Sequence, residues 1–339
     1  MDEVLAKCTP RLRSHIAAVD LDSLSRVAPA RLRELAVPHL GSVELVSGPD
    51  YESLYAPLYE SQFSGQERER SDLIVTRLEL EFSGQRDHLS PYRVVGVRGH
   101  DGQAIAAAQF SVLFLREGDS GPGLDGVAVP YLQYIYVRKQ NRRQGLSEVL
   151  HTLILAVASA DAKARLEVEG GGRLVVPFTF FETEPATAAA AVAGKAGGKD
   201  VSGKVDVSKA RAEVHTRTGA LVLMLKRGDG SLVSPHVQPG LEVGESPLTV
   251  VWMLRPSPQF DFDSIRRDEA RLTIIAEQLF EAYYRSLRDE GFPEDNIRLA
   301  ERIVKARCSK DHEKPRFVLL LLSEVTDTMY KNLNDFVQP

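Results

Sequence analysis

The chain has 339 residues, of which 43% are hydrophobic and 26% charged, with a formal net charge of −5 at pH 7. Domains typically hold about 100 to 150 residues, so this length allows one large core or two modest ones. The negative charge argues against non-specific binding to nucleic acid. Two cysteines in so long a chain argue against a disulfide framework and indicate a reducing compartment.

The termini predict neither secretion nor a membrane anchor. The N-terminus starts with acidic residues and has no long apolar run. The longest apolar run near the C-terminus, Phe317 to Leu322, is too short to span a bilayer. We therefore expect a cytoplasmic protein with no membrane partner and no nucleic-acid partner.

Residues 1 to 41 predict a small helical extension, with helix-like stretches at Leu21 to Val27 and Ala30 to Leu35. A helical stripe of tyrosine and leucine residues follows, with Asp50 as its candidate cap. Pro57 is expected to kink or shorten that helix. Leu73 to Phe82 predicts a second helix.

A strand hairpin comes next. Tyr92 to Val97 and Ala104 to Leu115 predict two strands, joined by Gly99-His100-Asp101-Gly102, whose Asp-Gly pair suits a tight turn. Tyr131 to Val137 predicts a third strand with alternating faces. One face carries Leu132, Tyr134 and Tyr136, and the other carries Tyr131, Gln133, Ile135 and Val137.

A basic turn containing a glycine joins the third strand to an amphipathic helix. Apolar residues from Leu146 to Val157 repeat at helical spacing, so the helix should begin near Gly145 and pack along one face. Gly145 lets the backbone approach a ligand, and the first helical N–H groups lack internal partners. Arg142 and Arg143, together with Arg138 and Lys139, add positive charge. The turn therefore predicts a diphosphate site; the alternative is an ordinary solvated loop.

The six residues from Arg142 to Ser147 resemble the (Q/R)-x-x-G-x-(G/A) signature of the GNAT superfamily of acyl-CoA N-acyltransferases. Ser147 stands where Gly or Ala is usual. The resemblance implies that the amides of Gln144 to Ser147 hold the pyrophosphate of coenzyme A, and that the strand edge pairs with its pantetheine arm. The cofactor-binding residues so implied are Ile135, Tyr136, Val137, Arg138, Arg142, Arg143, Gln144, Gly145, Leu146 and Ser147.

Further strands and helices extend the resemblance. Arg173 to Phe181 predicts a strand, Ser208 to Thr218 a helix, and Ala220 to Leu225 and Leu248 to Leu254 two more strands. The order of elements over about residues 42 to 256 is similar to that of GNAT proteins. It implies an α/β (α+β) fold with a mixed, mostly antiparallel central sheet flanked by helices.

Two segments lie outside that order. Residues 186–209, rich in Ala, Gly and Lys, predict an inserted loop, with a lid over the acceptor site as the alternative. Residues 257–339 predict a C-terminal α/β extension that packs on the core. It should contain a long helix through Leu272 and Tyr283, a helix from Asp295 to Ala306, and a strand from Arg316 to Leu322.

Three residues are candidates for acid or base catalysis. His215 lies in a segment that is similar to the family's F-Y-x-R-x-G-F, at the place of a Tyr that acts as general acid; the alternative is a helix-end cation. Glu182 and Glu184 follow an apolar strand and are candidate general bases, or a solvated strand end. Gln133 stands where relatives can carry a carboxylate, and it cannot act as a base.

Other residues are candidates for contacts with the acceptor. His236 and Gln238 lie between two prolines and would either hydrogen-bond a polar substrate or form a rigid turn. For an anionic substrate, Arg173, Arg211 and Arg217 are the nearest arginines in sequence.

Together these features predict an N-acyltransferase that takes acetyl-CoA, or another acyl-CoA, as cosubstrate and uses no metal. The acyl group would pass directly to an amine of a small molecule or protein, because neither Cys8 nor Cys308 lies in a nucleophile motif. The alternative is a non-catalytic acyl-CoA-binding sensor or scaffold with a GNAT fold, since His215 replaces the usual Tyr. Many GNAT proteins are dimers, so the resemblance leaves a homodimer open.

Overall fold

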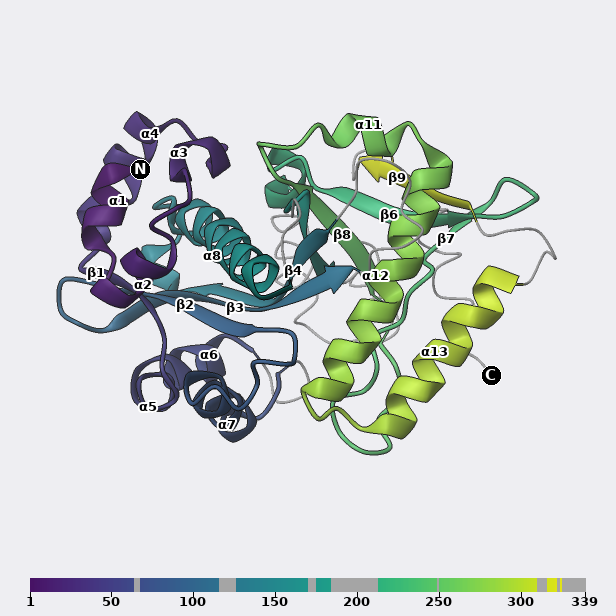
Figure 1. The fold of residues 1–339 in the computed structure, drawn as a ribbon, viewed down its shortest axis with the longest axis horizontal. Coiled ribbons are helices and arrows are strands. Elements are labelled where there is room, and N and C mark those ends of the chain that lie inside the picture. Colours follow the sequence, from purple (N-terminus) through teal and green to yellow (C-terminus); the bar gives the residue numbers. More distant parts are fainter. Residues whose placement is uncertain are drawn as a thin grey trace, which may run out of the picture. The chain divides into compact units, whose positions relative to one another are not determined.

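The computed structural model describes residues 1–63, 68–115, 126–169, 175–183, 213–248, 250–309, 316–321 and 324. The chain divides into unit 1, Met1–Thr179 with Ser257–Asp261, and unit 2, Phe180–Pro256 with Phe262–Pro339. Both units contain antiparallel strands with flanking helices, so the predicted fold class is confirmed (Figure 1). The units do not divide at residues 41 and 256, and the three-part domain scheme stays a prediction.

The N-terminal extension is helical, as expected. Proline occupies the first position of two of its helices, where its missing N–H leaves no bond unmade. The stretch expected to continue to Val27 ends at Leu24, because Ser25 takes an extended backbone conformation. The elements are α1 (Asp2–Lys7), α2 (Pro10–His15), α3 (Leu21–Leu24), α4 (Pro29–Leu35) and the 3₁₀ turn η1 (Val37–His39).

Four antiparallel strands form the sheet of unit 1. In order of pairing, these strands are β1 (Ser42–Leu45), β2 (Tyr92–Arg98), β3 (Ala104–Leu115) and β4 (Val127–Val137). The two hairpin strands and the turn between them confirm the prediction, and β1 was missed because it has only four residues.

A β-bulge interrupts β4. Gln109 of β3 lies opposite Tyr134 and the next residue, Phe110, lies opposite Leu132, so Gln133 has no opposite residue on β3. The strict alternation predicted from Tyr131 to Val137 is therefore wrong at this point. It holds beyond the bulge, where Tyr134 and Tyr136 pack into the same apolar cluster.

Helices cover both sides of this sheet. Figure 1 shows α8 (Leu146–Glu169) on one side of β2–β4, with α5 (Gly48–Asp50), α6 (Ala56–Gln62) and α7 (Ser71–Phe82) on the other. The cap of α5 is Ser47, whose Oγ accepts the N–H of Asp50, so the predicted cap at Asp50 is wrong.

The disturbance expected at Pro57 takes the form of a π-helical turn, η2 (Tyr51–Tyr55), directly before α6. The N–H of Ala56 donates to the carbonyl of Tyr51, five residues back. This wider turn accommodates a proline ring that would clash with a carbonyl in a regular α-helix.

The middle of helix α8 is buried on all sides, whereas its sequence predicted burial along one face. Residues 149–158 are all buried. The sheet covers one side of α8, and α3 of the N-terminal extension packs against it as well. The sequence does not show that a second face of α8 is covered, because that face carries small or mildly polar residues such as Ala156 and Thr152. Such residues can lie either on the surface or, as here, in the interior.

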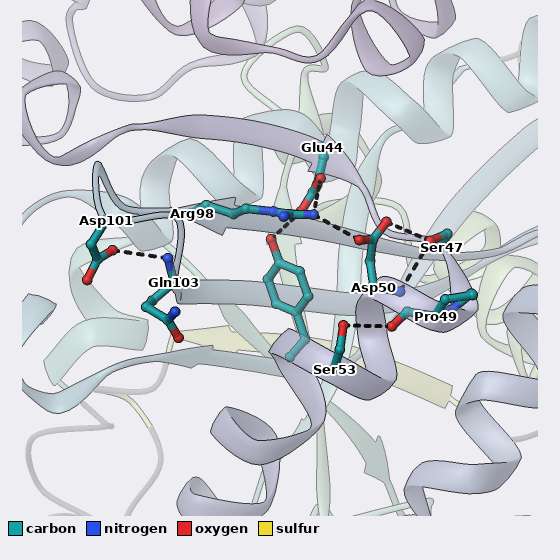
Figure 2. Close-up of polar contacts among 9 residues, drawn as sticks. Glu44, Ser47, Pro49, Asp50, Ser53, Arg98, Asp101 and Gln103 are labelled. Carbon is teal, nitrogen blue, oxygen red and sulfur yellow. Dashed lines mark hydrogen bonds and ion pairs between the residues drawn. The ribbon is translucent and has the colours of Figure 1, made fainter.

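A partly buried ion-pair network joins β1, β2 and α5 (Figure 2). The guanidinium of Arg98 donates to both carboxylate oxygens of Glu44 and, at 3.1 Å, to Asp50 Oδ1. The hydroxyl of Tyr55 donates to Glu44 Oε1 at 2.7 Å. Both carboxylates are thus held by arginine and hydroxyl donors, which is typical of a structural network.

Gly96 of β2 lies against the ring of Tyr55, and we expect Gly96→Ala to destabilise unit 1 by about 2 kcal/mol. A Cβ at this position would overlap the Cζ and Oη atoms of Tyr55. That ring cannot turn aside, because it is buried and hydrogen-bonded to Glu44. Urea unfolding followed by circular dichroism measures the loss. Gly99→Ala should lose clearly less stability, because its added methyl would lie 3.0 Å from Asp101 Oδ1, at the end of an exposed side chain that can move. Equal losses would contradict the clash.

The sheet of unit 2 has β6 (Leu221–Lys226) at its centre. β6 pairs antiparallel with β8 (Val251–Pro256), β7 (Leu232–Val233) and β9 (Arg316–Leu321), and β5 (Phe178–Thr183) adjoins β8. The predicted strands are present with shifted ends: β5 begins after Arg173, and β8 begins at Val251 because Leu248 instead bridges Gln238.

Helices of unit 2 include a short one at 213–217, then α11 (Phe262–Arg266), α12 (Glu269–Asp289) and α13 (Glu294–Ser309). Helix α12 packs against β9 and α13 against α12, so the C-terminal elements and β6 share one fold unit. The 186–209 insertion lies outside the described residues. Within the described part of the chain, every helix is too short or too polar to cross a bilayer.

Candidate functional site

The turn after β4 has an unusual backbone. The chain leaves the sheet at Arg138, whose N–H donates to the carbonyl of Ile105 at 2.8 Å, and a short 3₁₀ turn, η3 (Lys139–Asn141), follows. Arg143 has φ +66° and Gly145 φ +71°. Among the described residues Arg143 is the one non-glycine residue with a left-handed φ, a conformation that costs about 1–3 kcal/mol and often marks binding sites.

The amides of this turn are poised to bind an anion. The N–H groups of Gln144, Gly145, Leu146 and Ser147 donate to no acceptor within the described residues, whereas those of Glu148 and Val149 reach the carbonyl of Gly145 at 3.1 and 3.2 Å. These four consecutive donors span the start of a helix of 24 residues, whose dipole places partial positive charge at this end. Such a cap binds phosphate oxygens.

Side chains around the turn add charge and order. Arg142 and Arg143 are both exposed. Arg142 is held in place, because its guanidinium donates to Gln62 Oε1 of α6 at 2.8 Å and to the carbonyl of Val137 at 3.4 Å. The side chain of Asn141 donates to Gln144 Oε1 at 3.1 Å, so the middle of the turn is also ordered.

The other predicted cofactor residues differ in what they offer a ligand. The side chain of Tyr136 is buried and its hydroxyl accepts a hydrogen bond from Gln109, and Leu146 is buried as well. Both therefore present only backbone atoms. Ile135 is 37% exposed, Arg138 is half-buried and Ser147 is exposed, so these side chains are within reach of a ligand.

The N-terminal extension packs against the turn at Gly145. A Cβ on Gly145 would lie 3.3 Å from Leu35 Cβ and 3.7 Å from Ala36 Cβ. Gly145 is thus required twice, by its left-handed φ and by the close approach of the segment that ends α4.

The second candidate site is a buried carboxylate on β5. Glu182 Oε1 accepts a hydrogen bond from the hydroxyl of Tyr283 on α12 at 2.9 Å and contacts Nε2 of His236. The Glu182 side chain is 9% exposed, and the His236 side chain has no exposed surface. Three elements of unit 2 therefore converge on one carboxylate oxygen.

Burial controls the charge of His236. It lowers the pKa of His236 below the ordinary value, and the hydrogen bond and charge of Glu182 offset this only in part. His236 is accordingly neutral at pH 7, and its Nε2–H donates to the Glu182 carboxylate.

The loop that carries His236 is hydrogen-bonded to α13. Arg307 donates to the carbonyls of Ser234 and His236 at 3.0 and 2.9 Å. Burial lowers the pKa of Arg307 to about 10, which leaves the guanidinium charged at pH 7 and adds to the depression of the His236 pKa. The loop is therefore fixed by buried, charged hydrogen bonds.

Aromatic rings pack around His236. Trp252 of β8 stacks on Phe280 with ring centroids 4.3 Å apart, and its ring lies 4.5 Å from that of His236. Phe180 of β5 and Tyr283 pack edge-to-face at 6.1 Å. This surrounding excludes water, which strengthens the hydrogen bonds to Glu182.

The segment from Ser234 to Gly240 is a rigid turn. Gln238 exchanges two backbone hydrogen bonds with Leu248, and Asn296 donates to the carbonyl of Gly240 at 2.9 Å. Because His236 is fully buried, the hypothesis that it hydrogen-bonds a substrate is wrong, and the rigid-turn alternative holds.

His215 and Glu182 lie on opposite faces of β5. The ring of His215 packs on that of Phe181, with centroids 5.0 Å apart. Glu182 follows Phe181 directly, and successive side chains of a strand point to opposite faces. Glu182 shares its face with Phe180, since both contact Tyr283. The two candidates are thus not brought together, and their catalytic roles stay predictions.

Three other predicted residues, Glu184, Arg173 and Arg211, lie outside the described residues. Arg217 is exposed and pairs loosely with Glu213 at 3.7 Å. The sequence did not connect Glu182 with His236 and Tyr283, which are 54 and 101 residues further along the chain. No local spacing links positions so far apart.

Neither cysteine is activated for nucleophilic chemistry. Burial raises the pKa of Cys8 and of Cys308 to about 11, so both are protonated thiols at pH 7. Cys8 donates to the carbonyl of Val4 at 3.4 Å. A covalent acyl-cysteine intermediate therefore has no support from these residues.

The chain is similar in fold to several solved acetyltransferases. One is a GNAT superfamily phosphinothricin acetyltransferase from Sinorhizobium meliloti in complex with AcCoA, with 14% identity over 65% of this chain and 90% of that chain, at a TM-score of 0.34. Another is NAA60 from Arabidopsis thaliana in complex with a bisubstrate analogue, with 9% identity over 62% and 94% of the two chains, at a TM-score of 0.33.

A third is the ribosomal-protein-alanine N-acetyltransferase from Brucella melitensis biovar Abortus 2308, with 20% identity over 40% of this chain and 78% of that chain, at a TM-score of 0.24. No family model matches the sequence, and no curated protein matches it.

Proposed function

We propose that this chain, which resembles the GNAT acyl-CoA N-acyltransferases in the turn after β4, transfers an acyl group from acyl-CoA directly to an amine. The observation that carries the proposal is the row of four unpaired amides from Gln144 to Ser147. They lie at the start of α8, beside Arg142 and Arg143, as a diphosphate requires. Acetyl-CoA is the proposed acyl donor.

In the proposed reaction the amine nitrogen attacks the thioester carbonyl, a C–N bond forms and the C–S bond breaks. Glu182 takes the proton that the amine loses, because a carboxylate held by two donors in a largely dry site is fixed in position as a base. His215 cannot reach the same atoms from the opposite face of β5, so the departing CoA thiolate takes its proton from solvent. The acceptor is an amine of a small molecule or protein.

A second candidate is a binding protein that holds acyl-CoA without turnover. The observation that favours it is the small exposed fraction of Glu182, 9%, which restricts access to the proposed base. Binding of CoA is common to both functions, and turnover separates them.

The experiment is calorimetric titration with acetyl-CoA and CoA. We expect native protein to bind with a Kd on the order of micromolar, and Arg142→Glu/Gly145→Glu to bind at least roughly 100-fold more weakly, since charged hydrogen bonds contribute about 1.5–3 kcal/mol each. The matched control is Arg31→Glu/Gly102→Glu, which reverses an exposed arginine and replaces a left-handed glycine in the same unit.

The control should bind as native protein does. If folded native protein bound neither ligand, the proposed function would be wrong. Equal binding by the Arg142→Glu/Gly145→Glu variant would place the CoA site elsewhere. Once binding is established, a screen of amines for acyl transfer distinguishes the enzyme from the binding protein.

A further inference from the structure

We propose that His236 and Tyr283 are positioning residues that keep the Glu182 carboxylate ionised and in one orientation. This rests on the proposed acyl transfer, in which Glu182 is the base. The relevant geometry is that both side chains direct a donor at the same oxygen, Glu182 Oε1.

The two donors come from independent elements. His236 lies in the loop before β8, and Tyr283 lies in the middle of α12. A carboxylate anchored from a loop and from a helix cannot rotate about its side-chain bonds without breaking a buried hydrogen bond. Two donors also stabilise the negative charge in a site that water barely reaches.

His236 is itself held rigidly. Its backbone carbonyl accepts from Arg307, and Ser234 Oγ donates to the carbonyl of Val250 at 3.0 Å. The imidazole packs against Trp252 on one side and Tyr283 at 5.0 Å on another. A ring so confined can support Glu182 in only one geometry, which a loosely packed structural histidine would not do.

Three other titratable groups lie near this site. Tyr284 lies on α12 beside Tyr283, and burial raises its pKa. Arg307 and Cys308 lie on α13, where burial keeps the thiol neutral. Tyr284, Arg307 and Cys308 therefore keep their charge states between pH 5 and 8.

Tyr284 provides a matched control for Tyr283. Both are buried tyrosines on α12 with rings 5.1 Å apart. The Tyr284 hydroxyl has no hydrogen-bond partner within the described residues, whereas the Tyr283 hydroxyl donates to Glu182. Tyr283→Phe therefore removes a hydrogen-bond donor to Glu182, whereas Tyr284→Phe removes only a buried oxygen atom.

The first test is the pH dependence of acyl transfer. We expect Tyr283→Phe to lower kcat about tenfold with little change in KM, and to move the acid limb of the kcat/KM profile up by about one pH unit. Tyr284→Phe should leave both unchanged. His236→Gln, which keeps a donor near the position of Nε2, should retain more activity than His236→Leu. An unmoved acid limb in Tyr283→Phe overturns the inference.

The second test needs no turnover. Trp252 is the only tryptophan of the chain, and an imidazolium ring in contact with an indole quenches its fluorescence. Glu182 raises the pKa of His236 against the larger effect of burial, so Glu182→Gln should move the fluorescence midpoint down by about one pH unit. Glu213→Gln, at an exposed carboxylate of unit 2, should not move it.

The two tests separate two failures. If no amine is acylated but the midpoint moves, the proposed function is wrong and the buried network stands. If amines are acylated and the midpoint does not move in Glu182→Gln, His236 does not sense the Glu182 charge and the inference is wrong.

Discussion

Replacement of Glu182 by glutamine is expected to lower kcat/KM for acyl transfer by roughly 100- to 10,000-fold, the usual contribution of a general base. Glutamine has nearly the same shape and can still accept the hydrogen bond from Tyr283, but it cannot take a proton at neutral pH. The measurement is the initial rate of CoA release with the best amine found in the screen.

Glu213→Gln is the control, because it removes an exposed carboxylate from the same unit. The emission spectrum of Trp252 in both variants tests whether the aromatic packing around His236 is intact. A loss of less than about threefold in Glu182→Gln, with that packing intact, would show that Glu182 is not the base.

The geometry favours Glu182 over His215 as the base. Glu182 is held by two side chains in a nearly dry site, whereas His215 is half-buried on the other face of β5 against Phe181. A base gains from fixed orientation, since proton transfer requires a close and well-aligned donor. The departing thiolate needs no positioned donor, because water can protonate it.

The backbone of the turn after β4 could be predicted because every part of it is local. Gly145, the two arginines and the helix start lie within a few residues, and their roles follow from backbone geometry and charge. The strands were likewise predicted from short-range alternation. The bulge at Gln133 was not, because a bulge depends on register with β3 and leaves no clear sign in the strand itself.

The network around Glu182 could not be predicted for the opposite reason. Glu182 and His236 were each recognised as candidates, and Tyr283 as part of an apolar helix stripe, but their meeting depends on tertiary packing of β5, a loop and α12. The burial of the middle of α8 on all sides has the same origin. Its second covering comes from a segment more than 100 residues away in sequence, in α3.

Another long-range network ties the N-terminal extension to the core of unit 1. Asp161 of α8 accepts from Arg93 of β2 at 3.0 and 3.1 Å and contacts His15 of α2 at 3.0 Å. Arg93 also pairs with Glu81 of α7 at 3.1 Å. The Asp161 side chain is only 4% exposed, so its charge depends on these partners.

We therefore expect Asp161→Asn to lower the free energy of unfolding of unit 1 by about 3 kcal/mol, since it leaves Arg93 with one carboxylate fewer in a largely buried site. Calorimetry or urea unfolding followed by circular dichroism measures the loss, and Trp252 fluorescence reports unit 2 separately. Asp72→Asn, at an exposed ion pair with Arg70, should change stability by about 0.5 kcal/mol or less.

The loss of unfolding free energy in Asp161→Asn should also depend on pH. Burial raises the pKa of Asp161, but the hydrogen bond from His15 and the charge of Arg93 outweigh it, so the pKa lies below the ordinary value. A carboxyl with a lowered pKa stabilises the fold above its unfolded pKa and loses that effect as the pH falls through the folded value. Burial raises the pKa of Glu81, and the charge of Asp161 adds to this, so Asp161→Asn also brings the pKa of Glu81 closer to its ordinary value. The stability difference between native protein and Asp161→Asn should therefore be full at pH 7 and shrink below about pH 4; a difference that stayed constant to pH 2 would show that Asp161 acts through packing and not through its charge.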